Sequence, residues 1–332
     1  MKVLVFEWLT GGGLLIDRRP FNPLDSMVRQ GRLMLEALCG DLRRAGIQTT
    51  SPIDHHAAEF VTVDEPVLVK SAEQLSKMLA ELAAQCDRLI LIGPETGGRL
   101  RSVLQWVAPW QEKLISPNAA FVELASSKFQ TCKLLSEQGV QKHCGVLFDA
   151  ATEPWPPQFD LPAVLKPDDG AGSEGLVVVD DWRNVAKPIH GLYCVEPYIV
   201  GVHLSIGALC GPNGAVLLEP VHQHFDVSPI GHYLGGSFPV EPQLASVAKQ
   251  LVRSALEILP QTVGYIGFDL VLPKRCQEPF SGGIVEINPR LTSSYLGLRQ
   301  IYETNLAEAM IKVACGESVS LDLARIDVEF RI

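Results

Sequence analysis

Short apolar runs and helix-spaced apolar residues alternate along the first third of the chain. A continuous apolar run is typical of a buried strand, whereas apolar residues three and four apart are typical of an amphipathic helix. Strands that alternate with helices predict an open α/β domain with a parallel sheet over residues 1–115. The expected strands are residues 2–6 and 88–92, and the expected helices are residues 32–45, 71–82 and 95–106.

Ligands of such sheets bind beyond the carboxyl ends of the strands, so the loops after the two strands are candidate substrate loops. The first loop begins at Glu7 and contains Gly12 within a run of three glycines. It is either a flexible turn or a loop whose backbone contacts substrate, because it lacks the spacing of known phosphate loops. In the second loop, Glu95 either contacts substrate or stabilises the start of the following helix.

The pattern changes over residues 116–200, the second predicted domain. Ser127 is an expected N-cap for a helix over residues 128–138. An apolar strand, 163–167, then leads through a glycine-rich loop into another strand, 176–179. Such a hairpin can close over phosphates with its backbone N–H groups, and a plain hairpin turn is the alternative. The next strand, 193–201, contains Pro197, which favours an edge or a connector.

Residues 202–332 form the third predicted domain, in which strands predominate. The sequence at 211–214 predicts a hairpin turn between two strands. An amphipathic helix is expected next, then two more strands, and finally a closing helix. The expected strands are 204–210, 215–223, 265–271 and 283–288, and the expected helices are 243–259 and 302–315.

Polar side chains recur at alternate positions near the end of the last predicted strand. Glu286, Asn288 and Arg290 share one face, because side chains two apart on a strand point the same way. The preceding strand offers a single acid, Asp269. Oxygen ligands from two neighbouring strands beside a guanidinium suit magnesium and the phosphates that it carries. Lys166, at the end of its own strand, is a candidate phosphate contact.

Composition narrows the classes of function. The chain has 332 residues, 47% of them hydrophobic, and a net charge of −10. The acidic balance argues against nucleic acid as a partner, since phosphate backbones bind basic surfaces. No apolar run approaches the length of a membrane span, and no export signal is evident, so a cytoplasmic protein with reduced cysteines is expected.

The motifs together resemble those of the ATP-grasp ligases. Each piece alone is weak, but their order along the chain is specific, with Glu-Ile-Asn-Pro-Arg last. The resemblance covers residues 116 to 332 and implies a two-subdomain ATP-grasp fold preceded by the open α/β domain. The residues that carry it are Lys128, 164–167, 170–175, 196–199, 267–269 and 286–290.

The resemblance implies a role for each matching position. It implies that Lys128 and Lys166 bind the phosphates of ATP, under a flexible lid formed by Gly170, Gly172, Ser173 and Gly175. It implies that the backbone around Glu196, Tyr198 and Ile199 holds adenine. It also implies that Asp269, Glu286 and Asn288 bind two magnesium ions and that Arg290 contacts the transferred phosphoryl group. Manganese can replace magnesium in such sites. One position departs from the family: His203 stands where many members carry a ribose-binding acid.

A narrower resemblance is to the subgroup that contains tyramine–glutamate ligase of methanofuran biosynthesis. It rests on residues 6–13, 93–95 and 288–299. It implies an amide formed through an acylphosphate from glutamate and an aromatic amine, with Glu7, Tyr295 and Arg299 as candidate substrate contacts. The partners are then small molecules, and a homodimer is left open. The alternatives are a ligase for other amino acids, peptides or purine precursors, and a nucleotide-binding module without turnover.

Overall fold

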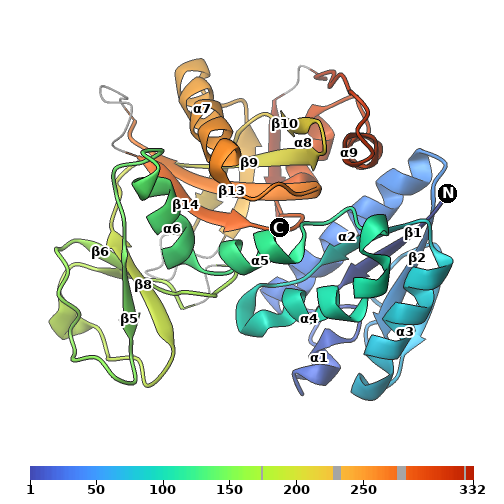
Figure 1. The fold of residues 1–332 in the computed structure, drawn as a ribbon, viewed down its shortest axis with the longest axis horizontal. Helices are drawn as coiled ribbons and strands as arrows, with labels where there is room; N and C mark the ends of the chain where they lie inside the picture. Colours follow the sequence, from blue (N-terminus) through green and yellow to red (C-terminus); the bar gives the residue numbers. More distant parts are fainter. Residues whose placement is uncertain (173–174, 227–232, 275–281, 325–326) are drawn as a thin grey trace.

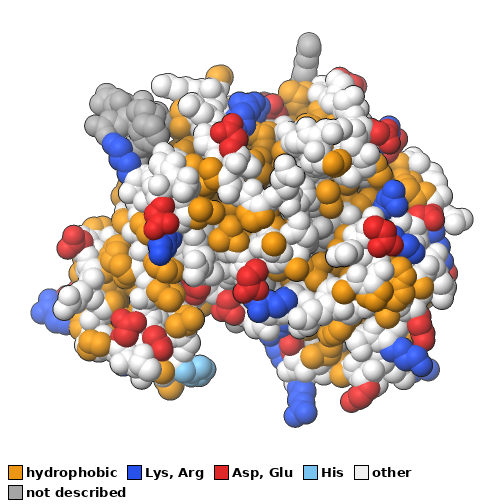
Figure 2. All heavy atoms as spheres, in the orientation of Figure 1, with side chains coloured by type: hydrophobic (Ala, Val, Ile, Leu, Met, Phe, Trp, Pro, Cys, Tyr) orange, Lys and Arg blue, Asp and Glu red, His pale blue; other side chains and the backbone are white. Residues whose placement is uncertain are grey.

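Three sheets organise the computed structural model of the protein (Figure 1). The structure describes residues 1–172, 175–226, 233–274, 282–324 and 327–332. Among them, no helix combines the length and apolar character needed to cross a membrane. On the face shown in Figure 2, Lys and Arg side chains are interspersed with Asp and Glu side chains.

The N-terminal sheet is parallel, with the strand order β3-β2-β1-β4. The predicted strands β1 and β4 are confirmed, whereas β2 and β3 were not predicted. Helix α2 begins earlier than expected because the side chain of Asp25 caps it, accepting from the N–H groups of Met27 and Val28. The strands are β1 (Lys2–Glu7), β2 (Gln48–Asp54), β3 (Pro66–Val69) and β4 (Arg88–Ile92), and the helices are α1 (Gly13–Ile16), α2 (Ser26–Arg44), α3 (Ala72–Gln85) and α4 (Arg99–Trp106).

A second, antiparallel sheet has the order β5-β8-β6-β7 and lies apart from the rest in Figure 1. The pair at one edge of this sheet contains the predicted strand–glycine loop–strand, since β6 and β7 are antiparallel neighbours. The strands are β5 (Val146–Asp149), β6 (Ala163–Pro167), β7 (Val177–Val179) and β8 (Leu192–Pro197). We call this unit the lid sheet.

The largest sheet follows the order β14-β13-β9-β11-β12-β15, with β10 paired to β9. Helices α5 and α6, although they precede the lid sheet in the chain, share a core with this sheet and α7. The strands are β9 (Val202–Gly211), β10 (Gly214–Leu217), β11 (Val221–Phe225), β12 (Tyr233–Phe238), β13 (Gly264–Leu272), β14 (Gly283–Asn288) and β15 (Val328–Arg331), and the helices are α5 (Ala119–Ala125), α6 (Lys128–Glu137), α7 (Pro242–Ile258), α8 (Tyr295–Ile301) and α9 (Leu306–Ala314).

Two predictions for this last unit were wrong in detail. The expected strand 215–223 is two strands, β10 and β11, with Pro220 between them; proline cannot donate to a ladder. The expected helix over 302–315 begins only at Leu306, where the side chain of Asn305 caps α9. The separate helix α8 precedes it and was missed.

The N-terminal unit and the largest sheet are joined by a continuous apolar core, to which α2, α8 and α9 contribute. At its margin the buried carboxylate of Asp41 on α2 accepts a hydrogen bond of 2.6 Å from the Tyr295 hydroxyl and pairs with the Arg299 guanidinium. This junction sets the carboxyl ends of β1 and β4 against the chain that follows β14, and the candidate site lies there.

Candidate functional site

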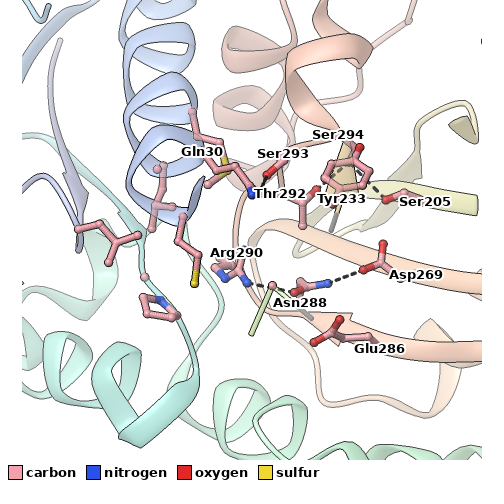
Figure 3. Close-up of a pocket in the computed structure, with 18 of the residues that line it drawn as sticks. Gln30, Ser205, Tyr233, Asp269, Glu286, Asn288, Arg290, Thr292, Ser293 and Ser294 are labelled. Atoms are coloured by element: carbon pink, nitrogen blue, oxygen red, sulfur yellow. Dashed lines mark hydrogen bonds between the residues drawn. The ribbon is translucent and has the colours of Figure 1, made fainter. Parts of the chain in front are cut away.

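The side chains expected to hold magnesium come together on β13 and β14. The two strands are antiparallel, with Asp269 opposite Glu286 and Gly267 opposite Asn288. The Asn288 side-chain amide donates to Asp269 Oδ2 at 3.1 Å (Figure 3). Gln223 from β11 donates to Asp269 Oδ1 at 2.9 Å. The predicted juxtaposition is therefore present, and the role of these residues as metal ligands stays a prediction.

The electrostatics of the acids fit a cation between them. Burial, and then repulsion from Glu286, raises the pKa of Asp269 to about 7. Burial also disfavours the charged form of Glu286, but Lys128 and Lys166 outweigh it and hold the pKa of Glu286 below its usual value. A divalent cation would relieve the repulsion between the two carboxylates. With the amide oxygen of Asn288, they form the oxygen-rich donor set that magnesium prefers.

Two lysines lie on the lid side of these acids. Lys128, at the start of α6, pairs with Glu286 at 3.1 Å and donates to the backbone carbonyl of Gly170. Lys166, at the end of β6, pairs with Glu196 at 2.7 Å and donates to the Val285 carbonyl at 2.8 Å. Both ammonium groups therefore stand between the lid sheet and β14, where they can offset the charge of phosphates.

The glycine loop spans this boundary. Gly172 and Gly175, between β6 and β7, have positive φ angles of 67° and 75°, which favour glycine. At its base, Asp168 accepts from the N–H of Phe129 and the hydroxyl of Ser127, which ties the loop to the start of α6. The predicted lid residue Ser173 lies outside the described residues.

A cavity of about 510 Å³ opens between the lid sheet and the largest sheet. Its polar end contains both lysines and the two acids, and its other walls are largely apolar, which suits phosphates at one end and a flat base at the other. The predicted adenine-binding residues Glu196, Tyr198 and Ile199 line it, as does His203, whose ring packs edge-on against Phe225 at 5.2 Å. The apolar walls are Val164, Leu176, Val178, Ile199 and Val271.

A second cavity, of about 110 Å³, lies on the other side of the acids, between the largest sheet and the N-terminal unit (Figure 3). Asp269 and Glu286 line both cavities, so the predicted metal platform stands where the two meet. The further lining is polar near β14 and apolar near α2. The polar members include Gln30, Ser205, Tyr233, Asn288, Arg290, Thr292, Ser293 and Ser294, and the apolar members include Leu9, Met27, Met34 and Ile92.

Arg290 enters this second cavity and is held in place from the N-terminal unit. Its Nε lies 3.0 Å from Glu95 Oε1, and one terminal nitrogen donates to Glu95 Oε2 at 3.3 Å and to Asn288 Oδ1 at 3.2 Å. Burial disfavours the charged guanidinium, but Glu95 and Glu286 more than offset this and raise the pKa of Arg290. Glu95, considered above as a substrate contact, thus orients the arginine.

Three other candidate substrate residues have structural partners elsewhere. Tyr295 and Arg299 both engage Asp41 and do not line the second cavity. Gly12 packs beside Val69 of β3, and its φ of 100° favours glycine. Glu7, in contrast, does line the second cavity.

Several lining residues were missed by the sequence analysis. Gln223 follows no recognised motif, and its contact with Asp269 joins residues 46 positions apart. Gln30 accepts a hydrogen bond of 2.7 Å from Ser293, although the two are 263 positions apart. The hydroxyl residues 292–294 follow β14 closely and lie within 288–299, the stretch that carries the narrower resemblance, but no role was predicted for them.

Comparisons with known proteins agree with this geometry. Residues 125–294 match the ATP-grasp domain family, just over half of the chain. Phosphoribosylamine–glycine ligase from Synechocystis is 29% identical over 166 residues, which are 46% of this chain and 39% of that protein. The chain therefore aligns with well under half of the length of this curated relative.

Solved structures extend the likeness of fold to almost the whole chain. An ATP-grasp superfamily protein from Archaeoglobus fulgidus superposes with a TM-score of 0.71 at 18% identity, covering 97% of this chain and 90% of that one. L-amino acid ligase from Bacillus licheniformis superposes with a TM-score of 0.69 at 15% identity, covering 96% of this chain and 76% of that one. The chain belongs to the ATP-grasp family, whose members are ATP-dependent ligases, and the resemblance inferred from the motifs is confirmed at that level.

The contact between Glu95 and Arg290 yields a prediction. Replacing Glu95 with alanine should lower kcat by roughly 10- to 100-fold, the usual cost of losing a partner that orients a functional side chain. Glu95→Gln keeps an acceptor for the guanidinium and should restore part of the rate. Steady-state ADP release measures both variants.

The exposed Glu81→Ala variant on α3 is the control and should behave as wild type. If both Glu95 variants instead raise KM by the same factor and leave kcat unchanged, Glu95 contacts substrate directly and does not act through Arg290.

Proposed function

We propose that this protein is an ATP-dependent carboxylate–amine ligase that forms an amide through an acylphosphate. One observation carries the proposal: Asp269 and Glu286 stand between two cavities, with Lys128 and Lys166 on one side and Arg290 on the other. The larger cavity suits ATP, and the smaller one suits a carboxylate that meets the γ-phosphate at the junction. Such an arrangement serves in-line phosphoryl transfer by position and charge.

The chain's own residues would perform distinct parts of this reaction. Lys128 and Lys166 offset the charge on the phosphates, and Arg290 faces the oxygens of the group in transfer. Asp269, Glu286 and Asn288 would hold magnesium, which when bound neutralises phosphate charge. Gly170 lines the larger cavity and Gly172 the smaller one, so the glycine loop between β6 and β7 would exclude water from the reactive acylphosphate. An amine then attacks the acyl carbon, and phosphate leaves.

The finer assignment is glutamate joined to tyramine or a related amine, as in furan-type one-carbon cofactor synthesis. It is supported by the motif resemblance over residues 288–299 and by the apolar side chains of Met27 and Met34, which α2 contributes to the second cavity. Two bound magnesium ions, or manganese in their place, belong to the same proposal. A non-catalytic module is less well supported, since the two lysines, the acids and Arg290 converge on one junction.

Product analysis tests both the ligase reaction and the assignment of its substrates. Purified protein with ATP and magnesium should release ADP and phosphate only when a carboxylate and an amine are supplied together, and the new amide should appear by mass spectrometry. Glutamate with tyramine is expected to give glutamyl-tyramine. A different amide would overturn the finer assignment alone, whereas no ADP release with broad pools of both substrates would overturn the ligase itself.

A further inference from the structure

Glu7 is a buried acid at the wall of the second cavity that the reaction outlined above does not use. It is the last residue of β1 and is only 2% exposed. The carboxyl end of a parallel strand is where such sheets present ligand-binding groups. Glu7 thus lines the cavity from the N-terminal unit, whereas β13 and β14 line it from the largest sheet.

Part of the Glu7 carboxylate is occupied by its own loop. Oε2 accepts from the N–H of Thr10 at 2.8 Å and from the Thr10 hydroxyl at 2.7 Å, whereas Oε1 accepts from the N–H of Leu9 at 3.0 Å. A carboxylate has about four acceptor positions, so Oε1 retains one. The three bonds explain the shape of the turn at residues 8–10 but leave one oxygen incompletely satisfied.

No cation of the protein neutralises this acid within the described ranges. Among those residues, no Lys, Arg or His nitrogen makes an ion pair with Glu7. Arg290 acts on it only at longer range, because its guanidinium is held by Glu95. Burial raises the pKa of Glu7, and the hydrogen bonds from Thr10 and Leu9 and the charge of Arg290 offset only part of this effect. A buried carboxylate without a counter-ion is costly, and a cationic ligand in the cavity would remove that cost.

The neighbouring helix packs closely against the Glu7 carboxylate, because Gly31 has no side chain. Gly31 of α2 also lines the cavity, and a Cβ atom there would lie 2.6 Å from Glu7 Oε1. The adjacent α2 positions in the wall, Met27 and Met34, are apolar, and the amide oxygen of Gln30 already accepts from Ser293. Glu7 is consequently the acidic group that this wall offers to a ligand.

We propose that Glu7, in the cavity wall that it forms with Gly31, is a subsite for the primary ammonium group of an amino-acid substrate whose carboxylate faces Arg290, β13 and β14. This inference rests on the proposed ligase function and adds the chemical class of the substrate. The acceptor amine carries the same ammonium chemistry, and the experiment below separates the two sources.

Paired ligands test the subsite. L-glutamate is compared with glutarate, which lacks the ammonium group, and tyramine with 4-ethylphenol, each with ATP and magnesium. In the wild type, L-glutamate should raise Tm and support ADP release, and its KM should be lower than that of glutarate. Glu7→Gln should raise the KM for L-glutamate by about 10- to 100-fold, the loss expected for one hydrogen bond to a charged group. The KM for glutarate should remain unchanged.

Helix α2 supplies a second variant and its control. Gly31→Ala keeps the acid but crowds Oε1, so it should reproduce the loss for L-glutamate. Gly40→Ala lies on the same helix with nothing within 4 Å of the added carbon, and it should match wild type. If Glu7→Gln unfolds the protein, the comparison of Gly31→Ala with Gly40→Ala still tests whether the Glu7 carboxylate contributes to binding L-glutamate.

Each outcome has a distinct meaning. A loss confined to tyramine keeps the ammonium subsite and assigns it to the acceptor amine. Equal losses for L-glutamate and glutarate, or no loss in either Glu7→Gln or Gly31→Ala, would overturn the subsite. Tm shifts by L-glutamate that depend on Glu7, without ADP release for any pair of substrates, would support the subsite and refute the ligase.

Discussion

Replacing Glu286 with alanine is expected to lower ATP turnover by at least about 100-fold while the protein stays folded, comparable to the loss of one preorganised electrostatic group. Glu286 faces Asp269 across the two strands, pairs with Lys128 and lines both cavities. Its removal takes one carboxylate from the predicted magnesium site and frees the lysine. The packing of β14 depends on other residues, so the stability should change little.

Two measurements check this expectation. ADP release gives the rate, and the rise in Tm on adding ATP with magnesium reports binding to the folded state. Glu286→Ala should lose most of that rise, whereas the exposed Glu257→Ala on α7 should keep both rise and rate. Turnover at the wild-type rate in Glu286→Ala would exclude Glu286 from the site.

Replacing Lys166 with methionine is expected to affect both stability and turnover. Lys166 is 5% exposed and pairs at 2.7 Å with Glu196, which is 4% exposed. Removing the lysine leaves the buried Glu196 carboxylate without its counter-charge, which costs about 3–5 kcal/mol in comparable pairs. The free energy of unfolding, from urea titration, should fall by that amount, and ADP release should fall with it.

A double variant separates the two effects. Lys166→Met with Glu196→Met replaces the pair by apolar side chains and should regain most of the lost stability, as such replacements often do. Turnover should stay low, because the phosphates still lack the ammonium group. Recovery of activity together with stability would show that Lys166 supports the fold and does not contact ATP.

The elements that bear the site were largely predictable. The strands β13 and β14 were predicted from apolar runs, and alternation placed Glu286 and Asn288 on one face. The helix α6 was placed by its cap, Ser127, whose hydroxyl accepts from the N–H of Gln130. These features are local: each depends on residues within a few positions along the chain.

Other elements could not be predicted in the same way. The strand β2 contains Thr49, Thr50 and Ser51, which are polar yet almost fully buried. Their backbone pairs with β1 and β3, so the strand exists because its neighbours hold it rather than because of its own side chains. Likewise, Tyr295 and Arg299 follow β14 closely, yet their partner is Asp41 on α2, more than 250 positions earlier.

The sequence by itself determined the family, the order of the lysines, acids and arginine along the chain, and their placement on strand ends and a helix start. Only the tertiary structure decided how these charges are partnered. Arg290 is held by Glu95 across 195 positions, and Lys166 donates to the Val285 carbonyl across 119. Coulomb attraction and hydrogen bonding act over a few ångströms of space, whatever the separation in sequence. For that reason only the fold shows that Glu95 is engaged with Arg290, and that Glu7 faces the cavity without an ion-pair partner among the residues that the structure describes.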